Sequence, residues 1–145
     1  MNTKIIAIAA LGTAGMLASV QALAHHSFAA EFDADKKLEM TGVVTKVEWT
    51  NPHTYFFIEV EGKDGHEEWA FEMGSPNGLM RRGWTKDTLE IGTEVLVTGT
   101  QARDGSHKAN AQAVIITEGC KRLFAGTSQR DFVEDENAKV EGCKP

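Results

Sequence analysis

Three histidines give this sequence its clearest potential for metal chemistry. His25 and His26 are adjacent, and His53 follows Asn51-Pro52. If the mature chain begins at His25, its α-amino group and imidazole can chelate one ion, and a third nitrogen would complete a copper site of the histidine-brace type. Imidazole and amine nitrogens suit Cu(II). His53 is the candidate for that third nitrogen, and His26 offers a second chelating mode through the amine and the intervening amide.

Simpler explanations fit the same histidines. A chain end that starts with His25 and His26 would bind copper weakly, as many histidine-led peptides do. Asn51-Pro52 is typical of a turn, and His53 would then only cap that turn. Both readings of each histidine stay open from the sequence.

A second candidate site combines Glu72 with Arg81, Arg82 and Trp84. Two guanidinium groups beside a tryptophan could receive a carboxylate or sulfate ligand. The alternative is an ion pair that docks a short helix, with Trp84 filling the core, because charged helix faces are usually solvated or paired.

The start of the chain has the pattern of a secretory signal. Lys4 precedes the apolar run Ile5–Leu17, and Ala22-Leu23-Ala24 supplies the small-x-small cleavage pattern. The run is shorter than the roughly 20 apolar residues that cross a bilayer. We expect cleavage after Ala24, removal of residues 1–24, and a periplasmic or secreted mature protein without a membrane span.

Composition narrows the classes of partner and activity. The chain carries 21 acidic and 15 basic residues, a net charge of −6. Nucleic-acid binding needs a positive surface, so we expect no nucleic-acid partner. The sequence has no G-x-S-x-G, no H-E-x-x-H and no phosphate loop. It favours a binding protein over an enzyme and leaves catalysis open.

The hydrophobic pattern predicts five strands and one short helix. The strands are expected from Leu38 to Trp49 and at Tyr55–Glu61, Glu67–Met73, Thr93–Thr100 and Ala109–Thr117. Period-two alternation and β-branched residues support them. Ser75 and Pro76 begin a helix of about two turns that Gly83 ends, and Trp84–Leu89 is expected to add another turn.

Three strands, a short helix and two strands follow the plan of the OB-fold, a small five-stranded β-barrel. An open five-stranded antiparallel sheet packed by the helix is the alternative. We expect one OB-like domain over residues 25–126. Residues 25–37 would form an arm or loop, and residues 127–145 a polar tail.

Several longer segments resemble a known family. They are His25–Asp33 (HHSFAAEFD), Val47–His53 (VEWTNPH), Trp69–Pro76 (WAFEMGSP), Leu79, Arg81–Trp84 (RRGW) and Ala102–Gly105 (ARDG). With them the chain resembles an uncharacterised family of exported bacterial OB-fold-like proteins, a domain of unknown function, over about residues 25–126. The resemblance implies an exported single-domain protein and brings no established activity.

Three functions therefore remain open. The first is a periplasmic binding module for a small ligand or a metal ion, copper foremost. The second is an interaction protein that docks another exported protein through the sheet and the Arg81–Trp84 segment. The third is a copper-dependent redox enzyme that uses the same terminal histidine.

Cys120 and Cys143, the chain's two cysteines, are predicted to form a disulfide, because an oxidising compartment favours pairing. Their separation matches no zinc-ligand spacing. The bond would tie the polar tail to the domain and stabilise the fold by roughly 3 to 4.7 kcal/mol. Thiol titration of denatured, unreduced protein should find no free thiol. Two reactive thiols per chain would exclude the bond.

Overall fold

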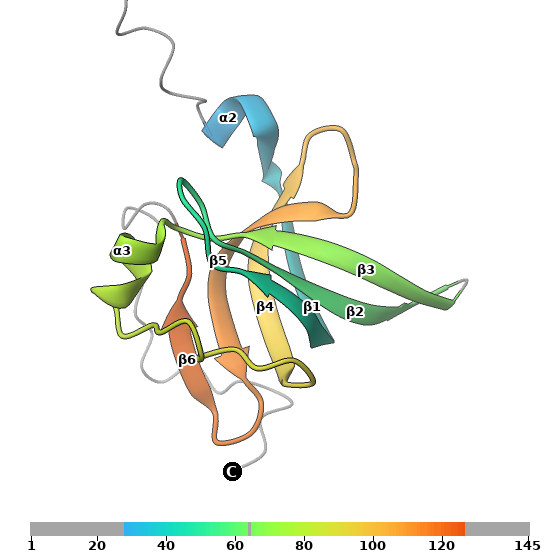
Figure 1. Ribbon diagram of the computed structural model, residues 1–145. Coiled ribbons are helices and arrows are strands. Elements are labelled where there is room, and N and C mark those ends of the chain that lie inside the picture. Colours follow the sequence, from blue (N-terminus) through green and yellow to red (C-terminus); the bar gives the residue numbers. More distant parts are fainter. Residues whose placement is uncertain (1–27, 64, 127–145) are drawn as a thin grey trace, which may run out of the picture.

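The computed structural model describes residues 28–63 and 65–126 and is mainly β. Its elements are α2 (Phe28–Glu31), β1 (Phe32–Glu48), β2 (Tyr55–Gly62), β3 (Gly65–Glu72), α3 (Pro76–Met80), β4 (Glu94–Ala102), β5 (Lys108–Ile116) and β6 (Lys121–Phe124). The two helices are short, and six strands carry the fold (Figure 1). No helix in this part of the chain is long and apolar enough to cross a membrane.

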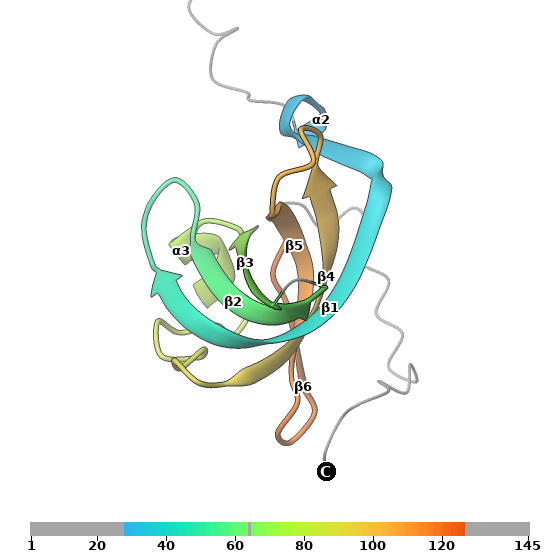
Figure 2. The same ribbon diagram turned by 90° about the vertical axis from the view of Figure 1, so that its right-hand side faces the viewer.

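The strands form one sheet whose order is β3-β2-β1-β4-β5-β6. Neighbours in this order pair antiparallel. A further, parallel pairing joins β3 to β5 and closes five of the strands into a ring (Figure 2). That closure is short: Ala70, Phe71 and Glu72 pair with Lys108, Ala109 and Asn110.

β1 is the long strand that makes the ring possible. Its first part pairs with β4 and its last part with β2, with a register shift between Val44 and Lys46. Gly42 lies where the two partners meet, and a Cβ there would come within 2.6 Å of the Glu59 carbonyl oxygen. A residue without a side chain lets the curved strand pass close to β2.

The structure corrects several boundaries. The part of the chain that the structure describes contains six strands, not five, and β1 begins at Phe32 instead of Leu38. The segment expected to be an arm or loop contains α2 and the start of β1. A polar segment could join the sheet because backbone pairing with β4 does not require apolar side chains.

The second half of the domain also differs from the expected pattern. Lys121–Phe124, where the hydrophobic pattern predicted no strand, is strand β6, and its last two residues, Leu123 and Phe124, are buried. α3 is five residues long, shorter than the two turns expected, and Trp84–Leu89 forms turns and bends instead of a helical turn.

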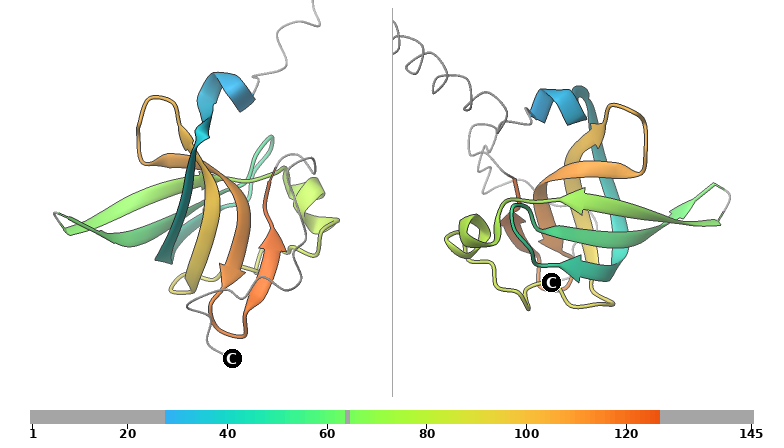
Figure 3. Two further views of the ribbon diagram at one scale, coloured as in Figure 1. Left: turned by 180° about the vertical axis from the view of Figure 1, so that it is seen from behind. Right: turned by 45° about the horizontal axis from the view of Figure 1, so that its top comes forward.

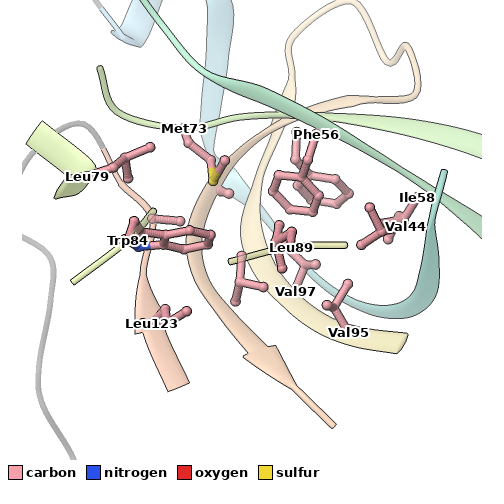
Figure 4. Packing of buried hydrophobic residues seen from close by; sticks show 14 of the residues in the cluster. Val44, Phe56, Ile58, Met73, Leu79, Trp84, Leu89, Val95, Val97 and Leu123 are labelled. Atoms are coloured by element: carbon pink, nitrogen blue, oxygen red, sulfur yellow. The ribbon is translucent and has the colours of Figure 1, made fainter. Parts of the chain in front are cut away.

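The core lies inside the ring and continues toward α3 (Figure 4). The rings of Phe56 and Phe71 stack with centroids 5.2 Å apart. Met73, Leu79 and Leu123 lie around the indole of Trp84, which is 2% exposed (Figure 4). α3 lies on the opposite side of the molecule from the tip of the β2–β3 hairpin (Figure 3).

Trp84 is also held by a specific hydrogen bond. Its indole Nε1 donates to the Phe124 carbonyl oxygen at 2.8 Å. The segment after α3 is thereby fixed to β6.

Replacing Trp84 with Phe should destabilise the fold by roughly 1–3 kcal/mol, because the hydrogen bond from the indole to the buried Phe124 carbonyl would be lost. Urea unfolding measures the change. Met80→Ala is the control, since Met80 is 51% exposed and should change stability by less than about 0.5 kcal/mol. Equal stability of Trp84→Phe and wild type would contradict this role.

Candidate functional site

Polar side chains from five segments meet at one end of the ring. α2, the β1–β2 loop and the β4–β5 loop lie at this end (Figure 1). The side chains belong to Glu31, His53, Tyr55, Glu72 and Lys108, and we call them the polar cluster. Strand register brings them together. Tyr55 is the β2 partner of Glu72, and Glu72 is in the β3 segment that pairs with the start of β5.

Glu72 is the centre of the polar cluster, and its side chain is only 8% exposed. Tyr55 donates its hydroxyl to Glu72 Oε2 at 2.6 Å. Lys108 Nζ lies 3.8 Å from the same oxygen. His53 Nδ1 lies 3.7 Å from the other oxygen, Oε1. A carboxylate so deeply buried requires such partners, because an isolated buried charge is costly.

His53 is oriented by two acceptors. Its Nδ1 lies 3.3 Å from the Met73 carbonyl oxygen, besides its approach to Glu72. A carbonyl only accepts, so the proton of this contact is on Nδ1. In the neutral ring Nε2 then carries the lone pair, and the side chain is 39% exposed. Metal-binding histidines typically have their second ring nitrogen bonded in this way.

Lys108 connects the polar cluster to the N-terminal segment. Its ammonium forms an ion pair with Glu31 of α2 and lies near Glu72. It also lies 5.5 Å from the centroid of the Tyr55 ring and 5.8 Å from that of Phe32. One ammonium therefore serves two carboxylates.

Burial raises the pKa of Tyr55 well above its usual range. The hydrogen bond to Glu72 raises it further, and so do the negative charges of Glu72, Glu31 and Glu48. In the neighbouring β4–β5 loop, hydrogen bonds from Ser106 lower the pKa of the exposed Asp104 carboxyl.

Two of the three predicted metal ligands lie outside the described residues. These are His25 and His26, and of the three only His53 is placed by the structure, in the polar cluster. Within residues 28–63 and 65–126 no group of three or more His, Cys, Asp or Glu side chains could hold a metal ion. Cys143 also lies outside these residues, so its pairing with Cys120 stays a prediction.

The structure does not gather Glu72, Arg81, Arg82 and Trp84 into one site. Glu72 belongs to the polar cluster, whereas Arg82 donates to the Gly126 carbonyl at 2.9 Å. The Arg82 guanidinium lies 4.6 Å from the centroid of the Phe124 ring. Trp84 is buried against the same segment, and Arg81 is exposed.

Sequence reasoning missed three members of the polar cluster: Glu31, Tyr55 and Lys108. Each is a polar residue at the end of a helix or strand, and this position is by itself weak evidence of a functional role. Lys108 lies near Glu72 because β3 pairs with β5, and no local sequence pattern predicts this pairing.

A family model matches residues 14–111, and its description is "Family of unknown function (DUF6152)". The chain belongs to this family. The match includes every member of the polar cluster. The matched range begins before His25, the first residue of the segments that carry the resemblance, and it ends within β5. A comparison with curated proteins found no match. Membership identifies the domain and supplies no activity.

Tyr55 is the chain's single tyrosine, so its ionisation can be followed by near-ultraviolet absorbance during an alkaline titration. In the folded protein tyrosinate should form well above pH 10, the usual value. The stability that the raised pKa contributes is present below about pH 10 and is lost as the pH rises through the folded-state pKa. Glu72→Gln should lower the midpoint and leave it above about 10, because burial remains.

Glu59→Gln is the control for this titration, because Glu59 is an exposed carboxylate on the same strand as Tyr55. It should leave the Tyr55 midpoint unchanged. A wild-type midpoint near 10, or identical midpoints in wild type and Glu72→Gln, would contradict the role assigned to Glu72.

Proposed function

We propose that this protein is an exported binding module that holds a copper ion between the mature N-terminal residue His25 and His53. The orientation of His53 carries the proposal. Its Nδ1 is engaged by the Met73 carbonyl, and its Nε2 remains for an ion. His25 would supply the α-amine and imidazole nitrogens, and Cu(II) prefers such ligands.

The charge around His53 supports a cationic ligand. Glu31 and Glu72 share the single ammonium of Lys108. The nearby Glu48 carboxylate is already paired with Lys46 at 2.5 Å. With a neutral His53, the polar cluster has one formal negative charge in excess, and a bound cation would compensate it.

The proposed ligand His25 is close in sequence to α2. His25 lies three residues before Phe28, where α2 begins. A chain spans at most about 3.3–3.6 Å per residue, so these residues can bridge roughly 10 Å. α2 is itself joined to Lys108, which contacts the Glu72 carboxylate beside His53.

We further propose that the ring is an OB-like barrel with β6 added at one edge. The ring order, with parallel β3 and β5 closing it, supports this assignment. OB-folds bind ligands on the face flanked by the loops after strands one and four. In this chain His53 lies on the first of these loops, and Lys108 follows the second.

A binding module is better supported than an interaction protein that docks through Arg81–Trp84. Arg82 and Trp84 already contact the chain's own residues Phe124 and Gly126. Export to the periplasm remains part of the proposal, because a free amine on His25 requires cleavage after Ala24.

The proposal is tested with protein secreted through its own leader, its N-terminus verified by intact mass. His25→Ala and His53→Ala should each weaken Cu(II) binding more than tenfold in a competition titration, a loss of about 1.4 kcal/mol. One extra residue before His25 should act similarly, because it displaces the amine.

His66→Ala is the matched control, since His66 is 64% exposed and lies near Glu59, outside the polar cluster. It should bind Cu(II) like wild type. Wild-type affinity in His53→Ala, or a mature chain that does not start at His25, would overturn the proposed site.

A further inference from the structure

The first half of β1 has one edge without a partner strand among the residues that the structure describes. β4 pairs with one edge of β1 from Phe32 to Val43, whereas β2 pairs with the other edge only from Val43 to Glu48. In Figure 2 this half of β1, coloured cyan, lies along the outer margin of the ring of strands. An unpaired sheet edge presents backbone amides and carbonyls to which another strand can bind.

Residues 37–41 are the regular part of this edge, and we call them the free edge. Their partners on β4 follow one another without a shift, from Thr100 opposite Lys37 to Leu96 opposite Thr41. The register shift of this pair of strands lies before residue 37. Irregular backbone makes an edge unsuitable for pairing, so only the free edge has the geometry that a further strand requires.

The two faces of the free edge carry different side chains. Met40 is the partner of the buried Val97, so Met40 and Leu38 lie on the core side, where both are partly buried. Lys37 and Glu39 lie on the opposite face and are exposed. Neither of these two residues forms an ion pair with another residue in the described part of the chain.

This arrangement of charges is complementary to itself. When two copies of the free edge pair antiparallel about a two-fold axis at Leu38, each Lys37 lies directly opposite Glu39 of the other copy. The symmetry produces this contact twice on one face. On the core side the two Leu38 side chains face each other. Opposite charges and apolar side chains placed directly across two strands both stabilise the pairing.

Other symmetric registers lack this complementarity. An axis at Glu39 places two carboxylates opposite each other, and an axis at Lys37 does the same with two ammonium groups. Like charges in directly opposed positions destabilise a strand pair. Lysine on an edge also discourages pairing with unrelated strands, whereas a glutamate in the opposing strand removes that obstacle.

The existing contact of Lys37 does not prevent the new one. Its Nζ donates to Thr100 Oγ1 at 3.3 Å. An ammonium has three protons to donate, so two remain for the carboxylate of Glu39 in a second copy. Lys37 is thereby already held on the face where the ion pair would form.

We propose that two copies of this protein associate by antiparallel pairing of their free edges, with the two-fold axis at Leu38. The two six-stranded sheets then become continuous through β1. No member of the polar cluster belongs to the free edge, so this interface is independent of the proposed copper site.

The test is charge reversal in the full chain, followed by sedimentation velocity over a range of concentrations. Wild type should show a monomer–dimer equilibrium. Lys37→Glu and Glu39→Lys should each weaken dimerisation roughly tenfold or more, because like charges then lie opposite each other at two symmetric positions. Lys46→Glu is the control and should dimerise like wild type, since Lys46 is exposed in the part of β1 that already pairs with β2.

Two rescue measurements separate loss of the interface from loss of the fold. An equal mixture of the Lys37→Glu and Glu39→Lys proteins should form a mixed dimer, because two glutamates on one chain then face two lysines on the other. The double variant, with both reversals on one chain, should dimerise like wild type. Circular dichroism should give the wild-type spectrum for every variant.

Three outcomes would overturn the proposal. A wild type that is monomeric at every concentration would do so, and would leave a strand of another protein as the candidate occupant of the free edge. Dimerisation unaffected by either single reversal would place the interface elsewhere. Failure of both rescues in folded variants would exclude the register with its axis at Leu38.

Discussion

The burial of the Glu72 carboxylate is the constraint on which this end of the molecule depends. Removing a carboxylate from water is tolerated only when charges and hydrogen bonds replace the lost hydration. Its partners come from β2, the β1–β2 loop and β5. Three segments are thus held at one point, and His53 acquires its orientation as part of this arrangement.

The β class and several local features could be predicted from the sequence, because they depend on short-range rules. Alternation of apolar residues predicted β2 and β3, and Gly62 and Gly65 bound the hairpin that joins them. Ser75 caps α3, accepting a hydrogen bond from the Gly78 amide at 3.3 Å. Each of these features is decided by residues a few positions apart.

The remaining features depend on partners that are distant in sequence. The polar start of β1 is a strand because β4 offers its backbone groups, and the short β6 is a strand because β5 does. The polar cluster likewise depends on contacts between residues that are distant in sequence. His53 could be proposed from its side chain, but Lys108 and Glu31 gain their roles only because the ring closes and α2 approaches β5.

The closure between β3 and β5 involves only three pairs of residues, and Glu72 and Lys108 are among them. Two members of the polar cluster therefore lie in the strand pairing that closes the ring. Separation of β3 from β5 would move Glu72 and Lys108 apart. A ligand that binds only the closed ring would therefore stabilise the ring against this separation. Proteases in the surroundings would then degrade the ligand-free protein faster than the ligand-bound protein.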